Sequence, residues 1–237
     1  MDIKNSLFCA AYFFALAWMG PHAHAQTAVQ TPPPVLAPGV APGWPALPPV
    51  ADPPSPPVVD PAKELKGPAL VEALRKGGFV LYMRHSETGT VTEKCDTSNL
   101  SAIGEENARS IGAALRDLKI PIGAVRSSQP CRCVGTARLL DLGTVDITED
   151  LNPSAPRPGF DIGAARSKRL AELPPVGTNT VLVSHLHGSR NKDEWLHLQM
   201  GEIIVFRPEA SPRAEAVARI QVADWAALKK AMAAGAR

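Results

Sequence analysis

The sequence has no excess of charge of either sign, and this balance excludes two classes of partner. Its 237 residues hold 25 Lys and Arg against 23 Asp and Glu, which gives a formal net charge of +2. A charge this close to zero favours neither a nucleic acid nor an anionic membrane surface as partner. We therefore expect no nucleic-acid partner.

Cysteine is also scarce, and the few cysteines lack the spacing of two known kinds of site. Cys95, Cys131 and Cys133 have no organised histidines between them, which disfavours a zinc site. A cysteine-phosphatase loop needs an arginine five residues after the cysteine and a glycine-rich cradle between them. Cys133 and Arg138 have that distance, but Val-Gly-Thr-Ala lies between them. The sequence thus predicts neither a metal nor a cysteine nucleophile.

The apolar stretch near the start is too short to span a membrane. It runs from Leu7 to Met19, whereas a spanning helix needs about 20 residues. Lys4 precedes it and Ala23-His24-Ala25 follows, as in a secretory signal peptide with its cleavage site. We expect residues 1–25 to be removed on export, so that the mature chain has no membrane span and is periplasmic or secreted.

Proline dominates the next segment. Of the 24 prolines, 13 lie between Gln26 and Pro61, where Asp52 and Asp60 are the charged residues. Such a segment cannot bury a core and favours an extended polyproline II conformation, either as a spacer or as a docking strip. We favour a linker over residues 26–62, followed by one domain over residues 63–237.

Two short apolar runs end in histidine. Phe79–Met83 leads into Arg84-His85, and Thr178–Ser184 leads into His185, with His187 as a competing candidate. Both runs are typical of buried strands of a mostly parallel sheet, in which ligands gather beyond the carboxyl ends of the strands. The alternative is that Arg84 caps a loop and that the histidines are ordinary half-buried residues.

The rest of the chain alternates between predicted helices and strands, so the fold class is α/β, a three-layer α/β/α sandwich with a mostly parallel central sheet. Glycine, serine and aspartate mark the ends of several helices. In the first half, we expect a helix from Pro68 to Lys76 closed by Gly77, a loop through Cys95-Asp96, and a helix from Ser101 whose apolar residues Ala108, Ile111, Leu115 and Leu118 face inward. A strand at 121–128 and a helical segment at 129–140 follow. In the second half, we expect a helix from Asp161 to Leu173 with Arg166, Lys168 and Arg169 solvated, an antiparallel strand pair at 202–207 and 216–221, and a closing helix at 225–234.

Arg132 falls in the first turn of the predicted helix at 129–140. A surface arginine is one interpretation. The start of a helix that follows a strand also offers free amide groups and a positive dipole end, to which a guanidinium adds a bidentate fork. This arrangement makes phosphate the obvious ligand.

Three segments in this order carry a resemblance to a known family. Arg84-His85 resembles an Arg-His-Gly motif, Ser128-Gln-Pro-Cys-Arg132 with Thr136-Ala137 resembles Ser-x-x-x-Arg-x-x-x-Thr-Ala, and Ser184-His185 resembles a second histidine after a strand. Together they resemble the histidine phosphatase superfamily, whose fold is phosphoglycerate-mutase-like. The resemblance covers roughly residues 79–221.

The resemblance implies a role for each matching residue. His85 would be the nucleophile that takes the phosphoryl group, and Arg84, Arg132 and His185 would surround the phosphoryl oxygens, without metal or cofactor. Glu149 is the candidate proton donor, with Asp150, Glu87 and Glu202 as other possibilities. The substrate would be a phosphorylated small molecule, a glycan or a protein. The sequence does not predict the oligomeric state.

Departures from the family pattern keep a second hypothesis open. Ser86 replaces the glycine after the first histidine, Val91 stands where many members have a phosphate-contacting asparagine, and Leu186 follows the second histidine. The alternative function is a catalytically impaired envelope module that binds phosphate or glycans.

The mature chain would keep an odd number of cysteines, so one disulfide and one free thiol are expected. We expect the bond to join Cys95 to Cys131, because it would tie the loop after the nucleophile to the segment that presents Arg132. Pairing of Cys95 with Cys133 is the alternative.

Overall fold

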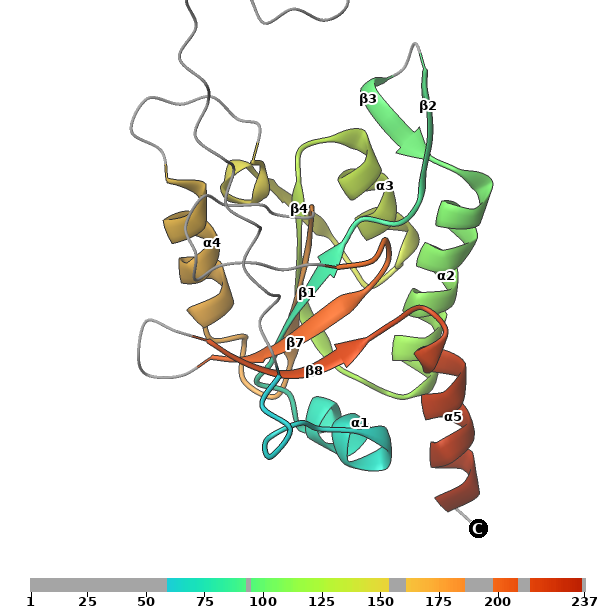
Figure 1. Cartoon of the computed structure of the whole chain (residues 1–237), viewed down its shortest axis with the longest axis vertical. Coiled ribbons are helices and arrows are strands. Elements are labelled where there is room, and N and C mark those ends of the chain that lie inside the picture. Colours follow the sequence, from blue (N-terminus) through green and yellow to red (C-terminus); the bar gives the residue numbers. More distant parts are fainter. Residues whose placement is uncertain (1–58, 93–94, 154–160, 186–197, 209–213, 236–237) are drawn as a thin grey trace, which may run out of the picture. The chain divides into compact units, whose positions relative to one another are not determined.

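A six-stranded sheet forms the centre of the computed structural model (Figure 1). The structure describes residues 59–92, 95–153, 161–185, 198–208 and 214–235, which all lie in one unit, residues 51–237. The predicted signal peptide and nearly all of the predicted linker lie outside these ranges, as do Leu186 and His187. Those predictions are untested.

The strands are arranged so that the two histidine-bearing strands are neighbours. The order is β5-β4-β6-β1-β7-β8, from β1 (Val80–Arg84), β4 (Ile122–Ser128), β5 (Val145–Thr148), β6 (Asn179–Ser184), β7 (Ile203–Arg207) and β8 (Glu215–Ile220). β1 pairs with β6 in parallel, with Arg84 opposite Ser184. β7 pairs antiparallel with both β1 and β8, so it is the one described strand of this sheet that runs against the others.

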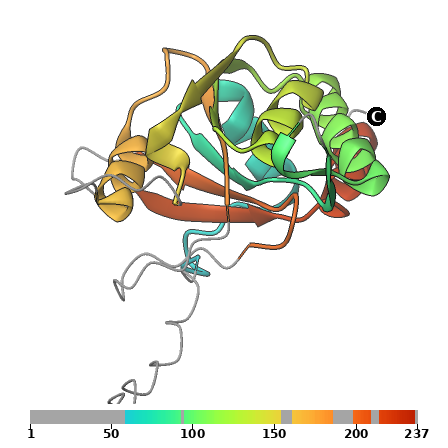
Figure 2. The ribbon, with the colours of Figure 1, turned by 90° about the horizontal axis from the view of Figure 1, so that it is seen from above.

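Helices cover both faces of the sheet. They are α1 (Gly67–Lys76), α2 (Ala102–Asp117), α3 (Cys131–Leu139), α4 (Ile162–Ala171) and α5 (Asp224–Gly235), with a 3-10 turn, η1, at Glu149–Leu151. The larger core joins one sheet face to α1, α2, α3 and α5, through residues such as Leu74, Leu115 and Trp225. The smaller core joins Tyr82 on the other face to Leu170 of α4. Figures 1 and 2 show α4 on the side away from α2 and α5. The predicted α/β/α sandwich is confirmed.

The helix ends follow the sequence signals. Ser101 precedes α2 and its side chain accepts a hydrogen bond from the Gly104 amide, while Asp161 does the same for α4. Gly77 ends α1 with φ of 79°, and a Cβ there would lie 2.5 Å from the backbone of Gly177. Only glycine meets both demands at this turn.

Two local predictions are wrong, and one strand was missed. A hairpin of β2 (Thr88–Thr92) and β3 (Cys95–Leu100) replaces the predicted loop, and the edge strand β5 was not predicted. Arg166 was predicted to be solvated but is 1% exposed, because it shares the inward face of α4 with Gly163 and Leu170. Within the described ranges, no helix is both long and apolar enough to cross a membrane.

Candidate active site

The carboxyl ends of β1 and β6 bring the two histidines together. The ring centroids of His85 and His185 are 5.5 Å apart, with an angle of 70° between the ring planes. Both residues are buried, at 6% and 5% exposure. The pairing register of β1 and β6 brings the two histidines side by side, because the His85 amide donates to the Ser184 carbonyl over 2.9 Å. The structure therefore places both predicted histidines at one sheet edge.

The ring of His85 is oriented by the backbone of the next residue. Its Nδ1 lies 2.8 Å from the Ser86 carbonyl oxygen. A carbonyl oxygen only accepts, so this bond assigns the proton to Nδ1 and leaves a lone pair on Nε2. Burial lowers the pKa of His85 to about 4; the Ser86 carbonyl raises it, and the charges of Arg132 and Arg84 lower it further. His85 is therefore neutral at pH 7, with Nε2 available as a nucleophile.

Two guanidinium groups belong to the same site. Arg84 donates from Nη1 to the Leu198 carbonyl over 2.8 Å, and its buried Nε has no partner among the described residues. Arg132 lies in the first turn of α3, with Nη2 3.2 Å from Nδ1 of His185. Burial lowers the pKa of Arg84, and the charge of Arg132 lowers it further. Two like charges with an unused buried donor favour an anionic ligand.

The peptide after His85 is tied to the helix that carries Arg132. Thr136 is fully buried, and its hydroxyl accepts from the Ser86 amide over 3.0 Å and donates to the Arg132 carbonyl over 2.7 Å. The sequence placed Thr136 in a motif but did not indicate a role for it. Its spacing of four residues after Arg132 was the available signal, because it puts both residues on one side of a helix.

Ser128 is a second residue whose role the sequence did not indicate. Its Oγ lies 2.9 Å from Nε2 of His185. The Cys133 sulfur lies 3.5 Å from the same nitrogen, and the Tyr82 hydroxyl donates to the His185 carbonyl over 3.2 Å. His185 is thus held by residues of β4, α3 and β1.

The serine at position 86 fits without strain. Among the described residues, Lys119 and Asp141 are the non-glycine residues with positive φ, so the backbone of Ser86 is ordinary. Its buried Oγ faces Gly201, where a Cβ would lie 3.7 Å from it. The position that requires glycine is Gly201 itself, with φ of 81° and a Cβ contact of 2.7 Å to Val222. The backbone conformation after the first histidine therefore does not require glycine.

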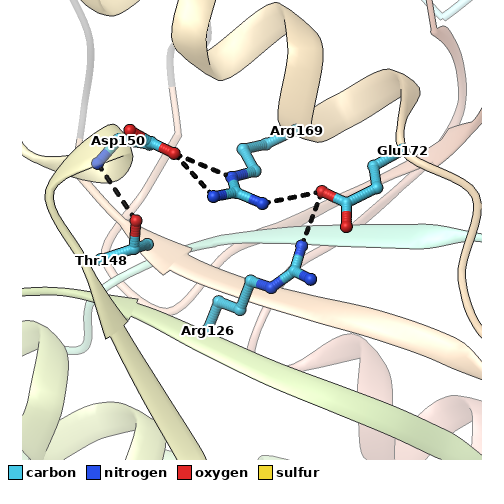
Figure 3. Close-up of polar contacts among 5 residues, drawn as sticks. All are labelled: Arg126, Thr148, Asp150, Arg169 and Glu172. Carbon is cyan, nitrogen blue, oxygen red and sulfur yellow. Dashed lines mark hydrogen bonds and ion pairs between the residues drawn. The ribbon is translucent and has the colours of Figure 1, made fainter.

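Asp150, one of the possible proton donors, is engaged in an ion-pair network (Figure 3). Its Oδ2 lies 2.6 Å from Nη2 of Arg169. Glu172 in turn accepts from Arg169 over 2.9 Å and from Arg126 over 2.7 Å. The hydrogen bond from Arg126 lowers the pKa of Glu172 against a smaller opposing effect of burial, and Arg169 lowers it further. The network joins η1 to α4 and β4, which indicates a structural role.

The other carboxylates differ in their surroundings. Glu202 is 1% exposed and accepts from Nε of Arg219 over 2.8 Å and from the Gln199 amide over 2.6 Å, so it also has a structural role. Glu87 accepts from the Ser101 hydroxyl over 2.9 Å. Glu149 is exposed and accepts from the Gln129 side chain over 3.3 Å. Of these three, Glu149 is the one at the surface of the turn after β5.

The structure excludes one of the two predicted disulfide pairings and leaves the other untested. Cys131 is disulfide-bonded and Cys133 is a free, buried thiol, so the alternative pairing through Cys133 is wrong. The side chain of Cys95 lies outside the described part, and its pairing with Cys131 stays a prediction. Burial raises the pKa of Cys133 to about 12, against smaller lowering by Arg132 and Ser128.

A cleft of about 480 Å³ lies between the β2–β3 hairpin and helices α2 and α3. Its lining includes Thr90, Ser101, Cys131 and Gly135, and Glu105 is its charged residue. None of the four predicted site residues lines it, so the cleft is distinct from the histidine pair. Across the described ranges, no group of three or more His, Cys, Asp or Glu could hold a metal ion.

Comparison with solved structures finds phosphatases. The structure of the protein histidine phosphatase SixA complexed with tungstate matches with 16% identity and a TM-score of 0.47, over 62% of this chain and 98% of that one. The alpha-ribazole phosphatase from Shigella flexneri matches with 19% identity and a TM-score of 0.42, over 58% and 94%. A phosphoserine phosphatase mutant from Entamoeba histolytica in complex with phosphoserine matches with 14% identity and a TM-score of 0.40, over 61% and 97%.

No family model and no curated protein matches the sequence. At the identities and TM-scores of these structures, the function has to be inferred from the residues of this chain.

Proposed function

We propose that the chain is an exported, metal-independent histidine phosphatase that hydrolyses a phosphate monoester through a phosphohistidine. The observation that carries the proposal is His85, a buried histidine whose Nδ1 is bound by the Ser86 carbonyl and whose pKa is lowered to about 4. It stands beside two arginines and a second histidine. These groups match the resemblance of the sequence to the histidine phosphatase superfamily.

The chemistry runs in two displacements. Nε2 of neutral His85 attacks phosphorus, the bond from phosphorus to the substrate oxygen breaks, and the leaving oxygen takes a proton. Water then attacks the phosphohistidine, which releases phosphate and returns His85 to its neutral form. Arg84 and Arg132 offer the preorganised positive charge that the equatorial oxygens need in both steps.

The substrate is a phosphorylated small molecule, a glycan or a protein outside the cytoplasm. The signal-peptide pattern in residues 1–25 supports export, and the proline-rich residues 26–62 would hold the domain away from the envelope.

The test is hydrolysis of an aryl phosphate by residues 26–237 in the presence of a chelator. We expect turnover by the wild type, none by His85→Ala, and a loss on the order of 10²- to 10³-fold for Arg132→Ala. Arg109→Ala is the matched control, because Arg109 is half exposed and, among the described residues, pairs with Glu105 of the same helix, α2. Trapping of an acid-labile phosphoenzyme identifies the intermediate. Turnover by His85→Ala at the wild-type rate would overturn the proposal.

Glu149 is our candidate for the proton donor. A donor matters most when the leaving oxygen is basic, so Glu149→Gln should slow hydrolysis of an alkyl phosphate far more than that of a nitrophenyl phosphate. Asp146→Asn on β5 is the matched control, since Asp146 is also an exposed carboxylate. Equal losses on both substrates would exclude Glu149 from this role.

The second candidate is a binding module without turnover. It is favoured by the engagement of Asp150 and Glu202 in ion pairs, which leaves few of the described carboxylates available for proton transfer. A folded wild type that binds sulfate through Arg84 and Arg132, but forms no phosphoenzyme with any phosphate monoester in a broad panel, would favour this function.

A further inference from the structure

One peptide group links Arg84 to a buried carboxylate. Nη1 of Arg84 donates to the Leu198 carbonyl over 2.8 Å. The amide of the same peptide group, that of Gln199, donates to Oε2 of Glu202 over 2.6 Å. The peptide between Leu198 and Gln199 is therefore held at both ends, by a guanidinium at its carbonyl and by a carboxylate at its amide.

Glu202 is itself held by two strands and by its own turn. It is 1% exposed, and its other oxygen, Oε1, accepts from Nε of Arg219 on β8 over 2.8 Å. Its amide donates to the Gln199 carbonyl over 3.1 Å, which closes a turn, and its carbonyl accepts from the Arg84 amide over 3.1 Å. The side chain thus has one oxygen bound to β8 and the other bound to the turn at 199–202.

The carboxylate fixes a peptide plane that the side chain of Leu198 does not fix. This side chain is 3% exposed and belongs to the smaller core with Tyr82 and Ile204, so it anchors the Cα atom. An anchored Cα still lets the next peptide rotate about the two backbone dihedrals that flank it. A rotated peptide would point its carbonyl away from Arg84. The hydrogen bond to Oε2 of Glu202 opposes this rotation, and it also polarises the carbonyl that Arg84 binds.

The orientation of this peptide determines what Arg84 offers to a ligand. A guanidinium is a rigid planar fork, so a fixed partner on one nitrogen restricts the direction of the others. The Leu198 carbonyl binds Nη1. The edge formed by Nε and Nη2 is then the one suited to two parallel hydrogen bonds with an oxyanion. Without the Leu198 contact, Arg84 would keep its charge but lose this direction.

We propose that Glu202 is a positioning residue for Arg84: its carboxylate holds the Leu198–Gln199 peptide, and the carbonyl of that peptide directs the Nε–Nη2 edge of Arg84 toward the bound oxyanion. The inference rests on the proposed function, because Arg84 serves the same anion site. It concerns binding, so no covalent bond forms or breaks, and its measurement does not need turnover.

The charge of Glu202 gives the test a clear sign. Replacing the carboxylate by an amide removes a negative charge, which by itself would strengthen the binding of an anion. Positioning predicts the opposite. Both groups that contact the carboxylate are donors, so the NH₂ group of a glutamine would face one of them, either Arg219 or the Gln199 amide. We therefore expect the peptide to loosen and the affinity for sulfate to fall.

Sulfate affinity is measured by NMR titration of the mature chain at constant ionic strength. We expect Arg84→Ala to weaken binding about 10- to 100-fold, and Glu202→Gln to weaken it about 3- to 10-fold. The double variant should bind as weakly as Arg84→Ala, within about twofold, because both changes remove the same contribution. Glu172→Gln is the matched control. It also removes a carboxylate that accepts from arginine, but it should leave sulfate affinity unchanged or slightly raised.

A second variant keeps the test decisive if Glu202→Gln does not fold. Glu202→Met combined with Arg219→Met removes both charges together, which a fold tolerates better than one unpaired buried charge. It should weaken sulfate binding as Glu202→Gln does. Unchanged or tighter binding in either folded variant, losses that multiply when Glu202→Gln is combined with Arg84→Ala, or no sulfate binding by the wild type would each overturn the proposal.

The two proposals fail separately. An active phosphatase whose sulfate affinity does not fall in Glu202→Gln refutes the positioning role alone. An inactive protein whose sulfate binding follows the expected pattern refutes the phosphatase alone.

Discussion

Replacing Thr136 by valine tests whether one buried hydroxyl holds the nucleophile and the arginine helix together. Valine has nearly the same shape, but it cannot accept the Ser86 amide, which is 3.0 Å from Thr136 Oγ1. Ser86 and Thr136 are both fully buried, so water is not a ready substitute. A buried donor left without an acceptor costs about 1–3 kcal/mol.

The expected loss can be read in two assays. For a domain of this size, about 1–3 kcal/mol lowers Tm by about 2–12 °C. Turnover should fall as well, because the Ser86 carbonyl orients His85, and a displacement of about 1 Å in an active site costs on the order of 10²-fold in rate. Thermal unfolding under non-reducing conditions and kcat for an aryl phosphate measure the two effects.

Two further variants separate the hydroxyl from the shape of the side chain. Thr136→Ser keeps the hydroxyl and loses one methyl, so it should lose about 1 kcal/mol and keep its kcat. Thr178→Val removes a hydroxyl that donates to the Pro175 carbonyl at the surface, and should change stability by less than about 0.5 kcal/mol. If Thr136→Val is as stable and as active as the wild type, the hydroxyl does not link the two segments and the reasoning is refuted.

Three other predictions concern single groups of the fold and the site. The pKa of His85 is lowered to about 4, chiefly by burial, so the rate of phosphoenzyme formation should stay constant from pH 8 to about 5 and fall only as His85 gains its proton near pH 4; a decline centred near pH 6.5 would contradict this. Glu202→Gln should cost about 2–3 kcal/mol in urea unfolding, because a buried carboxylate loses its charge opposite Arg219, whereas Asp117→Asn at the exposed pair with Lys229 should cost less than about 1 kcal/mol. Burial raises the pKa of Cys133 to about 12, so iodoacetamide at pH 8 should label it only after unfolding, as mass spectrometry would show.

The sequence predicted those parts of the fold whose signals are local. The histidine-bearing strands stand out because an apolar run stops abruptly at a polar residue, and Ser101 and Asp161 mark helix starts because their side chains bind amides only a few residues away. These interactions span at most four residues, so no knowledge of the rest of the fold is needed to expect them.

Features that depend on distant contacts were missed. The edge strand β5 has four residues with no fully buried side chain, so its sequence carries no alternation to detect. Arg166 is buried because other elements pack against its face of α4. The charge of an arginine, read from the sequence, predicts exposure instead. The contact of Ser128 with His185 depends on the register of β4 against β6, where Ser127 lies opposite Val183. The motif contained the serine, but only the sheet gives it a partner.

The arrangement of charge at the strand ends is best explained by a ligand that binds there. Burial and the charge of Arg132 both lower the pKa of Arg84, so its surroundings disfavour the charge that this arginine nevertheless keeps. The buried Nε of Arg84 has no partner among the described residues, which adds the cost of a desolvated donor. A site selected for stability alone would replace such groups by apolar side chains. An oxyanion would offset both costs at once, since it neutralises the charges and accepts from the free donor. The same anion would stand beside Nε2 of His85, which is why the groups that are costly to bury are those that the proposed reaction uses.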